Sequence, residues 1–168
     1  KNANDDATII IPHHDDFGIA DGQNFTIGMF FSLESTGNFD WVQIFNKGYP
    51  SGYSLNSASW NDDWSFSIAD NGQLMATSAI KNDGTIHSMV AVFGQDTLPR
   101  TIDVYIDEAH VVQLTYDDRW TSYGTSDLIL SGGTNPNQLF WNKFAFWRRK
   151  LSAQEISDWN NNKDIMLK

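Results

Sequence analysis

The chain has 168 residues, no cysteine and a formal net charge of −10, and 40% of its residues are hydrophobic. This length and composition predict one folded domain, residues 1–168, with a substantial core and no disulfide framework. The acidic balance argues against nucleic-acid binding, because phosphate contacts need a basic surface. No run of 18 apolar residues occurs, so no membrane insertion is expected.

Short apolar segments alternate with turn residues along most of the chain. The turns at 70–72 (Asp-Asn-Gly) and 82–84 (Asn-Asp-Gly) are typical of β-hairpins. Strands are predicted at residues 7–11, 25–33, 39–46, 52–59, 63–69, 73–80, 86–93, 100–106, 109–116 and 127–130, with a closing strand from 139. Many short strands at regular spacing predict an all-β, antiparallel β-sandwich.

The closing strand is apolar on both faces. By strict alternation, one face carries Phe140, Phe144 and Phe146, and the other carries Trp141 and Trp147. A strand of this kind is covered on both sides. We therefore expect the main core on one side and a short C-terminal helix on the other.

The sequence marks the start of that helix clearly. Ser152 and Glu155 have the spacing of a capping box, in which each side chain bonds the backbone N–H of the other residue. Leu151, Ile156 and Trp159 are the apolar residues through which the helix is expected to cover the strand.

Several segments, in this order, resemble the laminin-G-like domains of the concanavalin A-like lectin-glucanase superfamily. They are Ile11-Pro12-His13 with the strand from Phe25, Phe45 to Gly48 with Gly52 to Leu55, Val90 to Val92 with Val104 to Asp107, and the Arg149, Leu151, Ser152, Glu155 and Ile156 pattern. The resemblance implies a jelly-roll β-sandwich in an extracellular or cell-surface protein. The chain departs from the family pattern at His87, Glu108 and Asn142, where Trp, Gly and Asp are usual.

Some relatives of this fold degrade polysaccharides, which makes catalysis the first functional question. A retaining glycosidase needs two carboxyl groups about 5–5.5 Å apart. The chain has three glutamates, Glu34, Glu108 and Glu155, and they fall in a predicted turn, a hairpin and a helix cap. Because no paired carboxylates occur on one strand, the sequence favours a non-catalytic module.

Metal binding is the second question. Adjacent Asp pairs occur at 5–6, 15–16, 62–63 and 117–118. Most are explained as solvated loop charge, but calcium also takes oxygen ligands from such loops, and the resemblance implies a structural calcium at the rim in many relatives. No EF-hand spacing occurs, so no ligands are assigned and no cofactor is expected to be required. His13 and His14 are interpreted as loop residues without a metal.

The tryptophans carry the functional hypothesis. Those at 41, 141, 147 and 159 lie within predicted elements, where packing is the default role. Trp60 and Trp64 instead flank Asn61, Asp62 and Asp63 at a strand connection, and Trp120 follows Arg119 in a polar loop. A sugar stacks its C–H face on an aromatic ring and pairs its hydroxyls with amide, carboxylate and guanidinium groups. An alternative is that these loops only cap the sandwich.

The sequence therefore predicts a carbohydrate-binding, lectin-like module with a glycan or polysaccharide ligand. The acidic surface favours neutral glycans over polyanions. The alternatives are a protein-binding adhesion domain of laminin-G type and, less favoured, a polysaccharide-degrading enzyme. The oligomeric state is not indicated.

Overall fold

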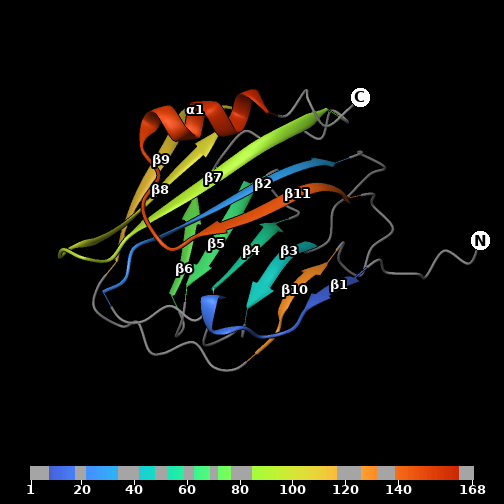
Figure 1. Cartoon of the computed structure of the whole chain (residues 1–168), viewed down its shortest axis with the longest axis horizontal. Helices are drawn as coiled ribbons and strands as arrows, with labels where there is room; N and C mark the ends of the chain where they lie inside the picture. Colours follow the sequence, from blue (N-terminus) through green and yellow to red (C-terminus); the bar gives the residue numbers. More distant parts are fainter. Residues whose placement is uncertain are drawn as a thin grey trace, which may run out of the picture.

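The computed structural model describes residues 8–17, 22–33, 42–47, 53–58, 63–68, 72–76, 85–116, 126–131 and 139–162. These residues form two antiparallel β-sheets and one α-helix (Figure 1). The predicted all-β sandwich with a short C-terminal helix is therefore confirmed. Within the described ranges, no helix is long and apolar enough to cross a membrane.

The strands form a six-stranded and a five-stranded sheet. The six-stranded sheet has the order β1 (Thr8–Ile11), β10 (Leu128–Ser131), β3 (Val42–Lys47), β4 (Tyr53–Ala58), β5 (Asp63–Ile68), β6 (Gly72–Ala76). The five-stranded sheet has the order β11 (Leu139–Trp147), β2 (Phe25–Leu33), β7 (Ile86–Gly94), β8 (Arg100–Ile106), β9 (Ala109–Tyr116).

Most predicted strands agree closely with these bounds, and three of them, at 25–33, 100–106 and 109–116, agree at both ends. Three local features differ from the prediction. The strand predicted at 73–80 is β6, Gly72–Ala76, and residues 77–80 lie outside the described part of the chain. The structure assigns β3 from Val42, and residues 39–41 lie outside the described part of the chain. The predicted loop 12–24 contains a short 3-10 helix, Asp15–Phe17, in which the Phe17 N–H donates to the His14 carbonyl at 2.9 Å.

The main core lies between the sheets and is rich in aromatic rings. Phe25 stacks on Phe93 with ring centroids 3.9 Å apart, and Phe146 lies 5.6 Å from Phe25 on the other side. Alternate residues of β2 and β7 supply most of this core, as expected for strands with one face turned inward. Its buried members include Phe25, Ile27, Met29, Phe31, Phe45, Met89, Ala91, Phe93, Ile102, Val104, Leu128 and Leu130.

A second apolar layer lies on the outer face of the five-stranded sheet, under α1 (Ala153–Asn161) (Figure 1). Leu151, Ile156 and Trp159 pack there against Phe30 and two valines of β7, with Trp147 partly buried beside them. Phe144 and Phe146 pack against the main core instead. The prediction that this strand is covered on both sides, by the core and by the helix, is confirmed.

The strict alternation predicted along the closing strand is wrong at one place. The pairing of β11 with β2 shifts between Trp141 and Lys143, so Trp141 lies opposite Phe31 while Lys143 lies opposite Phe30. An inserted residue of this kind changes which positions share a face. The alternation that Phe144, Phe146 and Trp147 follow is therefore interrupted at this register shift.

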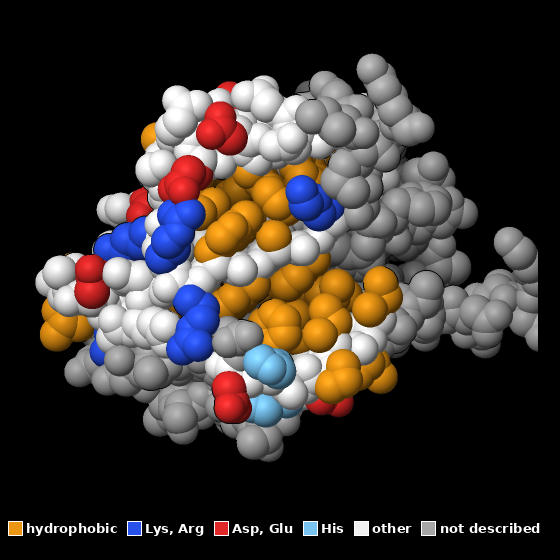
Figure 2. Space-filling model, viewed as in Figure 1, with side chains coloured by type: hydrophobic (Ala, Val, Ile, Leu, Met, Phe, Trp, Pro, Cys, Tyr) orange, Lys and Arg blue, Asp and Glu red, His pale blue; other side chains and the backbone are white. Residues whose placement is uncertain are grey.

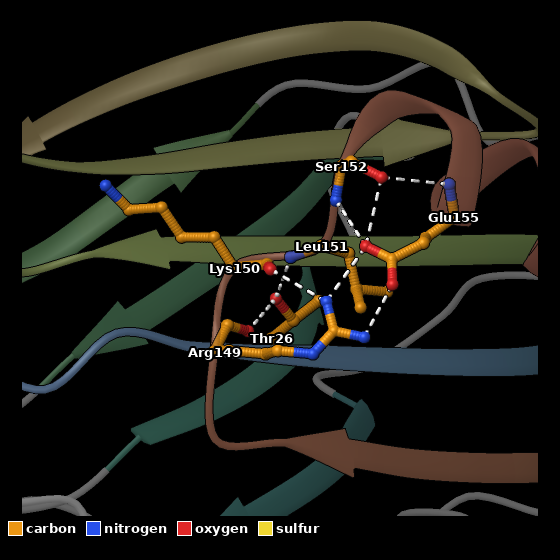
Figure 3. Close-up of polar contacts among 6 residues, drawn as sticks. All are labelled: Thr26, Arg149, Lys150, Leu151, Ser152 and Glu155. Atoms are coloured by element: carbon orange, nitrogen blue, oxygen red, sulfur yellow. Dashed lines mark hydrogen bonds and ion pairs between the residues drawn. The ribbon is translucent and has the colours of Figure 1, made fainter.

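The start of α1 has the predicted capping box (Figure 3). The Glu155 N–H donates to the Ser152 hydroxyl at 3.3 Å, and the Ser152 N–H donates to the Glu155 carboxylate at 2.9 Å. Arg149 donates through both Nη atoms to the same carboxylate. Just before the helix, Thr26 of β2 holds the chain in place: its Oγ1 donates to the Arg149 carbonyl and accepts from the Leu151 N–H. These bonds fix the helix to the end of β11.

This junction predicts a pH dependence of stability. Hydrogen bonds from Arg149, and then from Ser152, lower the pKa of Glu155 to about 2. Because the folded pKa lies below the ordinary value of 4.5, the contribution of the ionised group is present above that value and is lost as the pH falls toward 2. The urea midpoint of the wild-type chain should therefore fall more than that of Glu155→Gln between about pH 6 and about pH 3. Equal falls in the two proteins would contradict this.

Candidate functional site

The seven sequence-predicted sugar-site residues lie mostly outside the described part of the chain. This applies to Trp60, Asn61, Asp62, Arg119 and Trp120. Asp63 and Trp64 begin β5, where they pair with Ala58 and Ser57 of β4. The strand pair predicted on either side of residues 59–62 is confirmed, and the sugar-binding roles stay predictions.

The described residues that flank the two predicted groups lie at different ends of the sandwich. Ala58 and Asp63 lie at the end of the six-stranded sheet where β3 begins, because Ser57 pairs with Val42. Tyr116 pairs with Arg100, and Ser126 lies beside Lys47, where β3 ends. Figure 1 shows these ends on opposite sides of the molecule.

The buried Lys47 connects three segments at the end of the sandwich where β3 ends and where Ser126 lies. Lys47 Nζ donates to the Ser126 carbonyl and lies 3.0 Å from His13 Nδ1, and the His13 N–H donates to the Asp127 carboxylate at 2.9 Å. Burial lowers the pKa of the Lys47 ammonium, and the nearby Asp127 carboxylate partly opposes this. The ammonium therefore joins β3 to the segment before the 3-10 helix and to the start of β10. Sequence reasoning gave Lys47 no such role.

The metal hypothesis remains untested. Across the residues whose placement is described, no three His, Asp or Glu side chains group together as a metal site. Asp15 has a fully exposed side chain, and its carboxylate lies 3.8 Å from His13 Nε2. The Asp pairs at 5–6 and 117–118 lie outside the described ranges, so calcium stays a prediction.

At the other end of the sandwich, the β8–β9 turn is fastened to α1. Asp107 and Glu108 both have positive φ, 47° and 72°. The Asp107 carboxylate lies 2.7 Å from His87 Nδ1, and the Glu108 carboxylate accepts from Asn160 Nδ2 at 3.0 Å. His87 and Glu108 are two of the positions that depart from the family pattern, and here their side chains make structural contacts.

An aromatic corner lies between α1 and β11, and sequence reasoning assigned its residues to packing alone. The ring centroids of Trp147 and Trp159 are 5.1 Å apart, with an angle of 87° between the ring planes. Lys143 Nζ lies 4.4 Å from the centroid of Trp159. Figure 2 shows an apolar hollow between the helix and the sheet, with basic side chains at both of its ends. The concentration of Lys and Arg in residues 143–150 was the available sequence signal.

Comparisons with known proteins identify the fold. No protein-family model and no curated protein sequence matches the chain. Among solved structures, the binding domain of Paraclostridial Mosquitocidal Protein 1 aligns with a TM-score of 0.75 and 12% identity, over 96% of this chain and 42% of that one. Botulinum neurotoxin type C, whose cell entry depends on interaction with two ganglioside molecules, aligns with a TM-score of 0.72 and 11% identity, over 92% and 39%.

A third similar structure is the binding domain of botulinum neurotoxin DC in complex with rat synaptotagmin II. It aligns with a TM-score of 0.67 and 11% identity, over 94% of this chain and 46% of that one. The chain thus spans less than half the length of these chains. At such low identity the likeness establishes a shared fold. The laminin-G-like assignment within the sandwich folds is not confirmed.

Proposed function

We propose that the chain is a non-catalytic carbohydrate-binding module of a secreted or cell-surface protein. The observation that carries this proposal is the fold, which the chain shares over more than nine-tenths of its length with binding domains, including a neurotoxin that interacts with gangliosides. A ganglioside presents a glycan at its polar end. The matched chains are more than twice as long, so the proposal also rests on this chain's own residues.

The residues that support glycan binding are Trp60, Trp64 and the polar side chains between them. The β4–β5 register places Ala58 opposite Asp63, so this segment joins two adjacent antiparallel strands. Indole rings provide stacking surfaces, and Asn61 and Asp62 provide hydrogen-bond partners for hydroxyls. Arg119 and Trp120 supply the same chemistry.

The non-catalytic part of the proposal is supported by the glutamates. Glu155 is engaged in the cap of α1 and Glu108 is bound to Asn160. Glu34 lies outside the described residues. Each of the two described glutamates therefore has a structural partner.

A protein partner is the second candidate function. It is favoured by the similar structure in complex with rat synaptotagmin II. The glycan titration distinguishes the two candidates, because a protein interface buries about 800 Å² per partner and also depends on tryptophan hot spots, but it would bind no free glycan.

The expected result for the 60–64 segment is a loss of affinity without loss of folding. Trp60→Ala and Trp64→Ala should each weaken binding of a glycan ligand about tenfold, since an aromatic contact contributes on the order of 1 kcal/mol beyond burial. Calorimetric titration measures the affinity, and a denaturant melt of each variant measures stability.

Trp159→Ala serves as the reference for a structural tryptophan, because Trp159 is 7% exposed in the layer under α1. If Trp60→Ala and Trp64→Ala destabilise the chain as much as Trp159→Ala does, these rings cap the sandwich and the 60–64 sugar site is wrong.

A further inference from the structure

The aromatic corner formed by Trp147 and Trp159 depends on a glycine in the neighbouring strand. A Cβ placed on Gly28 of β2 would come within 2.9 Å of Trp147 Cζ3 and 3.0 Å of Trp159 Cε2. Real Cβ atoms essentially never show contacts below 3.0 Å, and contacts of 3.0–3.4 Å are tighter than nine in ten of those observed. The missing side chain therefore lets both indoles lie directly against the strand, with their planes nearly perpendicular.

The two rings differ in what they expose. Trp159 is 7% exposed, stacks on Phe30 with centroids 4.8 Å apart, and forms the wall of the corner. Trp147 is only partly buried. The hollow between helix and sheet in Figure 2 is lined by apolar side chains. An aromatic ring that is fixed from below by a glycine and from the side by a second indole is a preorganised stacking surface, with little side-chain entropy left to lose on binding.

The ammonium group of Lys143 lies beside this stacking surface and has no acidic partner among the described residues. Lys143 Nζ lies 4.4 Å from the Trp159 ring, and in the described part of the chain no carboxylate lies within ion-pair distance of it. Two nearby basic residues are already paired, Arg149 with Glu155 and Lys150 with Asp96. Lys143 is therefore a basic group beside the Trp159 ring that a ligand anion can use.

The charge around the hollow is opposite to that of the whole chain. Residues 143–150 hold four of the 11 Lys and Arg residues, in a chain whose net charge is −10. A single anion beside a ring face matches this arrangement, because Lys143 pairs with it at short range while the acidic surface elsewhere repels polyanions.

We propose that the corner is a binding subsite for a carboxylate-bearing sugar residue. The apolar face of the pyranose stacks on Trp147, and its carboxylate pairs with the Lys143 ammonium. Both groups lie against the same Trp159 ring, so one sugar residue reaches both. The proposal rests on the carbohydrate-binding function, and at this one site it assigns an anionic sugar instead of the neutral glycans that the acidic surface favours.

The test is an NMR titration of the whole chain with sialyllactose and, as the matched neutral probe, lactose. The indole N–H signals of Trp147 and Trp159 report the site. We expect sialyllactose to shift both signals and lactose to leave them in place. Lys143→Gln should weaken sialyllactose binding about tenfold, the value of one charge-assisted hydrogen bond.

The matched control is Lys150→Gln, which removes the same charge from a lysine paired with Asp96. Lys150→Gln should leave the sialyllactose affinity within about twofold, because the Lys150 charge is already paired with Asp96 and solvent screens it from the bound anion. A melt of each variant confirms folding.

Equal weakening by Lys143→Gln and Lys150→Gln would show non-specific attraction and overturn the subsite. Equal shifts with lactose would also overturn it. If the chain binds glycans while the Trp147 and Trp159 signals stay in place, the subsite is wrong and the proposed function stands. If the chain binds no glycan at all, both fall.

Discussion

Replacing Trp159 with alanine should lower the free energy of unfolding by about 3–5 kcal/mol, the range for a large buried aromatic side chain. Trp159 is 7% exposed and stacks on Phe30 at 4.8 Å, with Trp147 edge-on at 5.1 Å. With Ile156, it supplies the buried apolar surface of α1. A nine-residue helix is too short to persist without tertiary contacts. Removing the Trp159 ring should therefore also unfold α1 and expose the outer face of β2 and β7.

Chemical denaturation followed by circular dichroism measures this effect. Gln154→Ala is the matched control on the same helix, because Gln154 is exposed and, among the described residues, its side chain bonds only to Asp158 of α1. The control should stay within about 0.5 kcal/mol of wild type. A Trp159→Ala loss below about 1 kcal/mol would show that the helix does not depend on this ring.

Replacing Lys47 with alanine should be the second largest effect, about 3 kcal/mol. Lys47 is fully buried, and its ammonium donates to the Ser126 carbonyl beside His13. The substitution leaves a cavity and removes the donor from a carbonyl, and each of these costs about 1–3 kcal/mol.

Lys47→Met separates the two contributions, because methionine keeps most of the side-chain volume and loses only the donor. It should cost about 1–2 kcal/mol. Lys150→Ala provides the comparison with an exposed lysine in a surface ion pair, for which about 0–1 kcal/mol is expected. If Lys47→Ala and Lys150→Ala have the same denaturation midpoint, the buried ammonium does not organise this end of the sandwich.

Local sequence patterns predicted the features that depend on neighbouring residues in the chain, namely strand bounds and the helix cap. Alternating apolar residues and Gly- or Asp-containing turns gave the bounds of β2, β8 and β9, because side-chain periodicity is fixed within one strand. The capping box at Ser152 was readable because both partners lie within four residues.

Features that depend on pairing between distant segments were not predictable in this way. The bulge in β11 is defined by its register against β2, and the burial of Lys47 requires residues near 13 and 126 to meet it. The aromatic corner requires Gly28 to lie under Trp147 and Trp159. From the sequence alone, these tryptophans indicated packing, and only their juxtaposition with Lys143 indicates a ligand.

The candidate sugar site shows the same limit. Composition drew attention to the 60–64 and 119–120 segments together, since both combine tryptophan with polar side chains. The sheet topology separates the strand ends from which they leave. Residue type therefore predicted the chemistry of each segment, whereas their relative placement depends on strand order.

A glycan array probed with the 168-residue chain measures carbohydrate binding without assuming a particular ligand. We expect binding to a defined set of glycans, weakened by Trp60→Ala or Trp64→Ala. We also expect carboxylate-bearing sugars among the ligands, with Lys143→Gln reducing their signal and sparing neutral ligands. A folded chain that binds no glycan on the array would contradict the proposed carbohydrate binding.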